Sequence, residues 1–425
     1  MRLLVERSNL RGTVEIPGSK SHTIRAVAIS ALAQGASVIR RPLDSADARA
    51  AFRVYRALGA AIEDEGACWR VCGTGGALHA PDDIIDVANS GTTMNVALGS
   101  AALLRSGAAV LTGDGQVRRR PSGALEAALN DLGASVRSTR GNGCPPFVVS
   151  GRLRGGETTM QAMSSQYVTS LLINAPLADG DTRLRVPVLH EAPYVNMTLA
   201  WLRREGIRVE HADDLREFLI PGGQAYPALD CRIPGDFSSA TFFLAAGALP
   251  DNEVTALGLD MADPQGDKAV VDYLRDMGAG VCVEDAGIRV SARRLEGREI
   301  DLNATPDALP MMAALACFAH GATRLTNVPQ ARFKETDRIT VMREELTKLG
   351  ARVEELEDGL VVHESALHPA EVDGRGDHRI VMALAIAGTL LSGTTVIHGF
   401  EAVNVTFPSF LESLNALGAR TRVVA

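Results

Sequence analysis

A short motif ending in glycine recurs six times along the chain, and this repeat limits the folds that the sequence can adopt. The motif reads ALGA, DLGA, REGI, DMGA, KLGA and ALGA, with its glycines at positions 59, 133, 206, 278, 350 and 418. Successive glycines are therefore 74, 73, 72, 72 and 68 residues apart. Each glycine follows a helical pattern and precedes alternating residues, as expected where glycine caps a helix before a strand. We therefore predict six copies of a strand–helix–strand unit and the α/β fold class.

The chain has 425 residues, a length that favours two or more domains. The period exceeds that of ordinary solenoids, so each copy is expected to be a small subdomain. Six such copies could form one ring or two groups of three. The segment CRIPGDFSSATFFLAAGAL at 231–249 opens an apolar helix much as PGSKSHTIRAVAISALA does near the start. This similarity at the midpoint hints at two groups of three.

Composition excludes several classes of protein. With 46% apolar and 22% charged residues, the sequence is typical of a soluble globular protein. Acidic residues outnumber basic ones, 51 to 43, which argues against general affinity for nucleic acid. The longest apolar runs, at 311–319 and 381–391, are too short to cross a bilayer. The first ten residues lack the apolar core of a signal peptide, so we expect a cytoplasmic protein that does not bind membranes.

The six cysteines do not form a metal-binding pattern. Only Cys68 and Cys72 are close in the sequence, and CWRVC fits strand alternation better than a zinc knuckle. No second ligand pair stands at a suitable spacing, so no metal site is expected.

Polar clusters interrupt the repeat at the predicted starts of helices. They read GSKSHTIRA, NSGTTMN, VRRRPSGAL, SSQYVTSLL, RFKETDRI and GDHRIVMAL. Each cluster alone is most simply explained as a helix cap, a surface ion pair or a solvated turn. Together they place fixed cations at helix N-termini, where free N–H groups and the helix dipole favour anions. The cations are Lys20, Arg25, Arg120, Lys334, Arg338 and Arg379.

This set of residues predicts an enzyme site for two anionic substrates. Asp307 and Glu335 would supply carboxylates for proton transfer. The sequence contains no Walker-type loop, no dinucleotide-binding GxGxxG and no nucleophile elbow.

The clusters as a set resemble the 5-enolpyruvylshikimate-3-phosphate (EPSP) synthase family. The motifs PGSKSHTIRA, NSGTTM, RRRPSGAL, SSQYVTSLL, GDFSSATFFLAA, KETDRI and GDHRIVMAL run in family order along nearly the whole chain. The resemblance implies the two-domain enolpyruvyl transferase fold, an inside-out α/β barrel with three repeats in each domain. It implies a first domain at 18–233, a second at 1–17 plus 234–425, and an active site in the cleft between them.

The resemblance also implies a reaction. The enolpyruvyl (1-carboxyvinyl) group of phosphoenolpyruvate passes to the 5-hydroxyl of shikimate 3-phosphate and phosphate is released, a step of chorismate and aromatic amino acid biosynthesis. Addition followed by elimination needs a base for the hydroxyl and an acid for the vinyl carbon. No cofactor and no metal is implied, the partners are these two small molecules alone, and the enzyme is expected to be a monomer and a target of glyphosate.

The family motifs assign site residues by position. Catalysis would use Asp307 as the base, with Glu335 and Lys20 completing proton transfer. Arg338 and Arg379 would hold the carboxylate of phosphoenolpyruvate. Residues for shikimate 3-phosphate would be Lys20, Ser21, Arg25, Ser164, Ser165, Gln166, Tyr194, Asp307, Gln330 and Lys334. Residues for phosphoenolpyruvate would be Lys20, Gly91, Arg120, Gln166, Arg338 and Arg379.

The chain departs from the family pattern at four positions. Val405 replaces a lysine that contacts phosphoenolpyruvate, Asn95 replaces an arginine, Glu191 replaces a serine for the 3-phosphate, and Gln330 replaces an asparagine. One interpretation is a divergent shikimate-pathway enzyme with a rearranged site and weak inhibition by glyphosate. Another is a paralogue whose acceptor carries no phosphate near Glu191. We favour the first because the serine pair and the lysine for the 3-phosphate remain.

Two further alternatives stay open. The sister family that acts on UDP-N-acetylglucosamine normally carries a reactive cysteine where this chain reads GDGQVRRRPS, which contains none. A non-catalytic binding protein built from six repeats is the other alternative. It predicts that Asp307 and Glu335 could be neutralised without loss of function.

Overall fold

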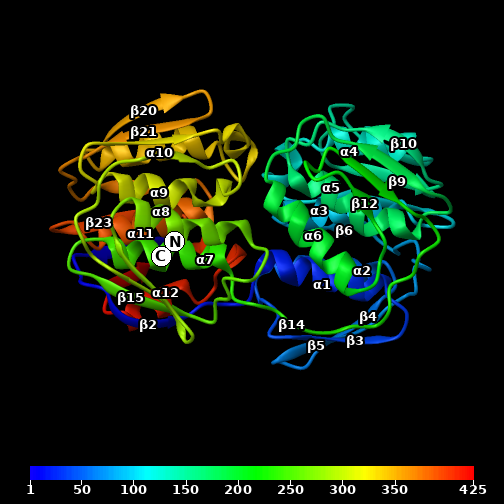
Figure 1. Cartoon of the computed structure of the whole chain (residues 1–425), viewed down its shortest axis with the longest axis horizontal. Coiled ribbons are helices and arrows are strands. Elements are labelled where there is room, and N and C mark those ends of the chain that lie inside the picture. Colours follow the sequence, from blue (N-terminus) through cyan, green and yellow to red (C-terminus); the bar gives the residue numbers. More distant parts are fainter. The chain divides into compact units, whose positions relative to one another are not determined.

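The computed structural model describes residues 1–425, and its contacts divide the chain into two units. Unit 1 comprises Met1–Pro17 and Pro234–Ala425, and unit 2 comprises Gly18–Ile233. Figure 1 colours these units along the sequence, so the blue N-terminal strands of unit 1 appear among its yellow and red segments. Unit 1 is therefore built from both ends of the chain.

Six four-stranded sheets share one topology. In each sheet an edge strand pairs in parallel with the second strand, which pairs antiparallel with the fourth, and the third strand lies at the other edge. Each sheet carries two helices, so one copy has the arrangement βαβαββ. In four copies a helix follows each of the first two strands along the chain, and the other two copies take their first strand from elsewhere in the sequence. The predicted α/β repeat is confirmed, although each copy holds a second helix and two additional antiparallel strands, which form a hairpin in five of the six copies.

Unit 2 contains three such copies. The first comprises β14 (Asp230–Arg232), α1 (Lys20–Leu32), β3 (Ala36–Arg40), α2 (Ala46–Ala57), β4 (Ala61–Asp64) and β5 (Cys68–Cys72). The second comprises β6 (Ile85–Asp86), α3 (Gly91–Ala101), β7 (Ala108–Thr112), α4 (Gly123–Asp131), β8 (Ala134–Ser138) and β9 (Phe147–Gly151). The third comprises β10 (Gly156–Thr159), α5 (Ser165–Asn174), β11 (Thr182–Arg185), α6 (Ala192–Arg204), β12 (Glu210–His211) and β13 (Glu217–Ile220).

Unit 1 repeats the same order. Its first copy comprises β2 (Arg11–Glu15), α7 (Phe237–Ala248), β15 (Glu253–Leu257), α8 (Val270–Asp276), β16 (Gly280–Glu284) and β17 (Gly287–Ser291). Its second comprises β18 (Glu299–Asp301), α9 (Leu309–Ala316), β19 (Ala322–Thr326), α10 (Arg338–Lys348), β20 (Arg352–Leu356) and β21 (Gly359–His363). Its third comprises β22 (Glu371–Asp373), α11 (His378–Gly388), β23 (Thr394–His398), α12 (Phe410–Ala416), β24 (Arg420–Val424) and β1 (Arg2–Glu6).

Three strands join copies that are distant in the sequence. β14 pairs with β3 and completes the first sheet of unit 2 with residues from its far end. β2 pairs in parallel with β15, and β1 lies between β23 and β24. These pairings require the chain to start in unit 1, build unit 2 and then return.

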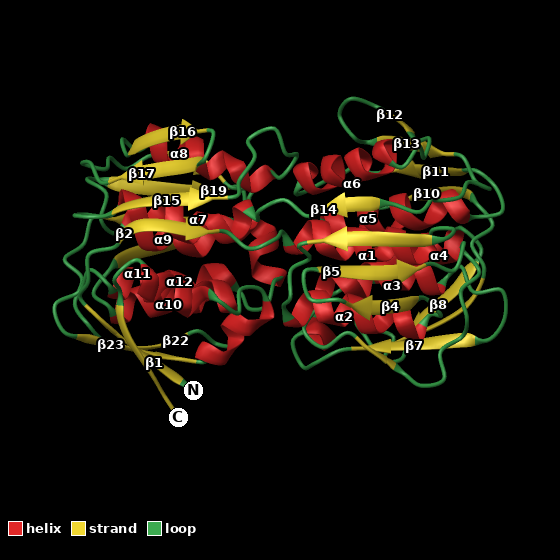
Figure 2. Ribbon diagram, turned by 90° about the horizontal axis from the view of Figure 1, so that it is seen from below, coloured by secondary structure: helices red, strands yellow, loops and turns green.

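The first helix of every copy lies inside its unit. α1, α3, α5, α7, α9 and α11 are buried along almost their whole length, as expected for helices that are apolar on all sides. We call these six the inner helices. Figure 2 shows helices packed behind the sheet formed by β16, β17, β15 and β2. The second helix of a copy, such as α2 or α10, keeps one polar face.

The six repeat glycines have the left-handed conformation that their spacing predicts. Their φ angles lie between 73° and 106°, a range that favours glycine because residues with a Cβ are strained there. After each of these glycines the chain turns from the second helix of the copy into its third strand. The feature that all six copies share is therefore a glycine at the C-terminal end of the second helix.

Candidate active site

Many of the predicted site residues lie at or near the N-termini of inner helices, and the two units cap these helices differently. In unit 2 the N-caps of α1, α3 and α5 are Ser19, Ser90 and Ser164, whose hydroxyls accept from backbone N–H groups. In unit 1 the N-caps of α7 and α11 are Asp236 and Asp377. Unit 2 thus opens its inner helices with neutral groups, which leaves their positive dipole ends available to external anions.

Arg25 on α1 is a buried cation held only by uncharged oxygens. It is 2% exposed, and it donates to the hydroxyls of Thr169 and Thr198 at 3.2 and 2.9 Å. It also donates to the carbonyls of Ser21 and Tyr194, each at 3.0 Å. Burial lowers the pKa of Arg25 to about 10. The structure therefore joins three predicted residues, Ser21, Arg25 and Tyr194, around a positive charge that donates to hydroxyl and carbonyl oxygens.

Lys20, the first residue of α1, pairs with a carboxylate that the sequence analysis missed. Its Nζ lies 3.2 Å from Oδ2 of Asp47, which is buried in the first turn of α2. In the sequence, Asp47 reads as an ordinary acidic residue near a helix N-terminus. Nothing in that pattern indicates that it would balance the charge of Lys20.

Gly91, Arg120 and Gln166 form a second group in unit 2. A Cβ added at Gly91 would lie 2.6 Å from Nη1 of Arg120, so the guanidinium rests against the start of α3. Asn95, one turn further along α3, donates to Oε1 of Gln166 at 2.8 Å. The group therefore brings together three segments that are distant in the sequence.

Glu191, one of the four departures, points into the start of α5. Its Oε2 accepts from the hydroxyl of Ser165 at 2.7 Å and from the Ser165 backbone N–H at 3.2 Å. Glu191 is buried and has a φ of 59°, in the left-handed region. One of the two serines predicted to bind a phosphate therefore donates its hydrogen bonds to a carboxylate of the protein itself.

The carboxylates of unit 1 surround Arg338 at the start of α10. Its side chain is 1% exposed, and it donates to Asp307 at 2.6 Å, Glu335 at 2.5 Å and Asp377 at 2.8 Å. Burial alone lowers the pKa of Arg338, but the negative charges of Asp377, Glu335 and Asp307 outweigh it and raise that pKa above its usual value. We call these four residues the Arg338 cluster.

Arg379 joins the Arg338 cluster through Asp307. Nη2 of Arg379 lies 2.8 Å from Oδ2 of Asp307, while the other oxygen of Asp307 contacts Arg338. The side chain of Asp377 also accepts from the backbone N–H of Arg379 at 2.9 Å. Asp377 was not among the predicted site residues, because an aspartate before a helix reads first as an N-cap.

The three other predicted or departing residues of unit 1 are Gln330, Lys334 and Val405. Gln330 is buried, and its amide nitrogen donates to the Asn303 carbonyl at 3.0 Å. Lys334 is half-buried and follows the 3₁₀ segment Pro329–Phe333. Val405 is half-buried at the end of another 3₁₀ segment, Phe400–Val405.

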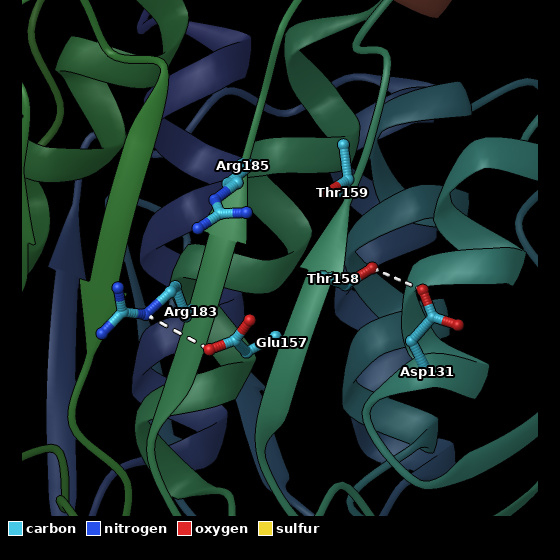
Figure 3. Close-up of a pocket in the computed structure, with 6 residues that line it drawn as sticks. All are labelled: Asp131, Glu157, Thr158, Thr159, Arg183 and Arg185. Carbon is cyan, nitrogen blue, oxygen red and sulfur yellow. Dashed lines mark hydrogen bonds and ion pairs between the residues drawn. The ribbon is translucent and has the colours of Figure 1, made fainter.

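A surface pocket of unit 2 contains none of the candidate residues. Figure 3 shows it over β10 and β11, where Arg183 lies 3.6 Å from Glu157 and Thr158 donates to Asp131 at 2.7 Å. Its ion pair is exposed to solvent, so it contributes little to stability.

The structure contains neither a candidate metal site nor a helix that could cross a membrane. No group of three or more His, Cys, Asp or Glu residues is arranged to hold a metal ion, and all six cysteines are free thiols. None of the helices combines the length and apolar character that crossing a bilayer requires.

Solved structures define the class of protein to which this fold belongs. The enolpyruvyl transferase NikO from Streptomyces tendae has a TM-score of 0.80 at 21% identity, with 99% of this chain and 98% of that chain covered. EPSP synthase from Acinetobacter baumannii has a TM-score of 0.83 at 27% identity, with 99% and 100% covered. The fold is that of the enolpyruvyl transferases.

Sequence comparison identifies the family within this class. The family model for EPSP synthase (3-phosphoshikimate 1-carboxyvinyltransferase) matches residues 4–414. The 3-phosphoshikimate 1-carboxyvinyltransferase of Acetivibrio thermocellus is 54% identical over 419 residues, covering 99% of both chains. That of Ruminiclostridium cellulolyticum is 50% identical over 424 residues, covering 100% of both. The chain belongs to the EPSP synthase family.

Proposed function

We propose that this protein transfers the 1-carboxyvinyl group of phosphoenolpyruvate to the 5-hydroxyl of shikimate 3-phosphate in aromatic amino acid biosynthesis. The acceptor oxygen forms a bond to C2 of phosphoenolpyruvate, the bond from C2 to the phosphate oxygen breaks, and the hydroxyl proton leaves with inorganic phosphate. The observation that carries this proposal is the match to the family over residues 4–414. Both units are needed, since each holds part of the residue set.

Unit 2 supplies most of the groups for shikimate 3-phosphate. Arg25 and Ser21 bind the shikimate carboxylate, which supplies a counter-anion to a buried guanidinium that otherwise donates to hydroxyl and carbonyl oxygens. Ser164 and Ser165 bind the 3-phosphate at the start of α5, together with Lys334 of unit 1. Tyr194 lies beside the ring, and the remaining contacts are those of Gln166 and Gln330.

Unit 1 supplies the catalytic carboxylates and the arginines for phosphoenolpyruvate. Asp307 takes the proton of the 5-hydroxyl, while Glu335 and Lys20 move protons to and from the vinyl carbon. Arg338 and Arg379 bind the phosphoenolpyruvate carboxylate, a ligand to which arginine is suited. One carboxylate oxygen of Asp307 contacts Arg338 and the other contacts Arg379. Binding of the phosphoenolpyruvate carboxylate therefore requires Asp307 to break at least one of these two ion pairs.

The phosphate of phosphoenolpyruvate is bound by unit 2. Arg120 and the start of α3 at Gly91 supply a cation and free N–H groups, and Gln166 adds a side-chain donor. The protein acts as a monomer in the cytoplasm, which sedimentation and cell fractionation test.

The experiment that tests this function is phosphate release from phosphoenolpyruvate with one acceptor at a time. We expect turnover with shikimate 3-phosphate and none with shikimate or UDP-N-acetylglucosamine. Turnover with an unphosphorylated acceptor alone would instead support the divergent paralogue.

Substitution of Gly91 by alanine is expected to raise the KM for phosphoenolpyruvate about tenfold, the scale of one weakened charged hydrogen bond. The added methyl would lie 2.6 Å from Nη1 of Arg120 and displace the guanidinium from the start of α3. Initial rates at saturating shikimate 3-phosphate measure this KM. Gly115→Ala is the control, because its Cβ would lie 3.6 Å from Arg119, an ordinary contact. An unchanged KM in G91A would contradict the assignment of Arg120.

Substitution of Glu191 by glutamine is expected to lower the KM for shikimate 3-phosphate about three- to tenfold, because a negative charge beside the 3-phosphate is removed. Glutamine keeps an oxygen that can accept from Ser165. The KM for phosphoenolpyruvate should not change. Glu157→Gln, on the exposed face in Figure 3, is the matched control. A higher KM for shikimate 3-phosphate in E191Q would show that the carboxylate supports acceptor binding.

A further inference from the structure

Asn95 lies at the centre of a buried hydrogen-bond network in unit 2. Its Nδ2 donates to the Gly91 carbonyl at 3.0 Å and to Oε1 of Gln166 at 2.8 Å. Its Oδ1 accepts from the hydroxyl of Ser122 at 2.8 Å. Asn95 and Ser122 are buried, whereas Gln166 is only half-buried. We call these four residues the Asn95 network.

The hydrogen bonds of this network determine the orientation of the side-chain amides of Asn95 and Gln166. The Gly91 carbonyl can only accept, so the atom of Asn95 that faces it must be the amide nitrogen. Because the same nitrogen faces Gln166, the group of Gln166 that meets it must be the oxygen. The oxygen of Gln166 is thus used within the protein, and its amide nitrogen is the end that remains for a ligand.

We propose that Asn95 is a positioning residue that makes Gln166 an obligatory hydrogen-bond donor to phosphoenolpyruvate. This inference rests on the proposed function and identifies a residue that acts through another. Phosphate and carboxylate oxygens accept hydrogen bonds, so an amide nitrogen aimed at them binds and an amide oxygen repels. The orientation of Gln166 therefore sets the affinity for the anion.

The position of Asn95 suits this role. It lies one turn into α3, whose first residue is Gly91, and its partner Ser122 follows Arg120 by two residues. Through Gln166 it also reaches the first turn of α5. Asn95 therefore links the three segments to which we assign the phosphate of phosphoenolpyruvate.

The test is a double-mutant cycle with Asn95→Asp and Gln166→Met. The carboxylate introduced by N95D can only accept, so Gln166 must turn its nitrogen inward and present its oxygen to the ligand. We expect N95D to raise the KM for phosphoenolpyruvate about 10- to 100-fold, with a much smaller change in kcat. Q166M should raise the same KM by a similar factor, since methionine offers no donor.

The double mutant separates positioning from a general structural role. If Asn95 acts through Gln166, N95D in the Q166M background should change this KM less than about threefold, because no amide remains to reorient. An equal N95D effect in both backgrounds would overturn the inference. So would an unchanged KM in Q166M, a substitution at a half-buried position that tests the donor even if N95D does not fold.

The failure of the inference can be told apart from failure of the proposed function. Wild-type turnover with shikimate 3-phosphate is measured first, and its absence counts against the function. Normal wild-type turnover together with an unchanged KM in the variants counts against the role of Asn95 alone.

Discussion

Asp307→Asn is expected to lower kcat by about 10²- to 10⁴-fold, the range over which general acid–base catalysis contributes. Asparagine has nearly the same shape and can still accept from one of the two arginines, but it cannot take a proton from the 5-hydroxyl. Phosphate release at saturating concentrations of both substrates measures the effect. Asp301→Asn, an exposed carboxylate on β18, is the matched control and should retain wild-type kcat.

The folding of the D307N variant must be checked together with its kcat. D307N should keep a cooperative thermal transition, since it leaves Glu335 and Asp377 in contact with Arg338. A folded D307N variant with wild-type kcat would assign the base to another group. Retained activity in variants of both Asp307 and Glu335 would revive the non-catalytic alternative.

Arg338→Met is expected to destabilise unit 1 by about 3–5 kcal/mol, the cost of leaving buried carboxylates without their cation. Arg338 is 1% exposed and contacts three carboxylates, so no water can replace its donors without opening the structure. Urea unfolding followed by circular dichroism measures the loss.

A residue of the same helix provides the comparison for Arg338. Arg343 on α10 pairs with Glu355, but both side chains are partly exposed. Arg343→Met is therefore expected to cost less than about 1 kcal/mol. Equal stability losses for R338M and R343M would mean that the Arg338 cluster is not a buried ionic network.

In both units, carboxylates of the protein contact hydrogen-bond donors to which we assign the binding of substrate anions. Asp47 forms an ion pair with Lys20, and Glu191 accepts a hydrogen bond from the Ser165 hydroxyl. Asp307 forms ion pairs with both Arg338 and Arg379. A cation with little exposure to solvent needs a counter-ion, and Asp47 supplies one for Lys20 while Asp307 supplies one for Arg338 and Arg379. If the site residues act as proposed, we expect substrate binding to exchange these anions and to free Asp307 for chemistry.

The repeat and the chemistry of the inner-helix starts could be read from the sequence because both are local signals. Gly59, Gly133 and their equivalents cap helices, and a glycine at that place is the expected residue. The serine caps at Ser19, Ser90 and Ser164 likewise follow from the residues beside them. Such features depend on only a few neighbouring residues.

The rest depended on contacts between distant segments. The pairing of β14 with β3 joins residues almost 200 positions apart, and no local pattern specifies it. Glu191 meets Ser165 because a left-handed turn before α6 directs its side chain inward, which composition does not reveal. The pairing of Lys20 with Asp47 and the second helix in each copy were missed for the same reason.

The most direct test of the central claim follows the fate of one oxygen atom. Phosphoenolpyruvate labelled with ¹⁸O at the oxygen between C2 and phosphorus is incubated with the protein and shikimate 3-phosphate, and the products are analysed by mass spectrometry. Transfer of the enolpyruvyl group breaks the C–O bond, so the label should appear in inorganic phosphate while the acceptor gains the enolpyruvyl group. Label in pyruvate, with the acceptor unchanged, would mean P–O cleavage and would contradict the account.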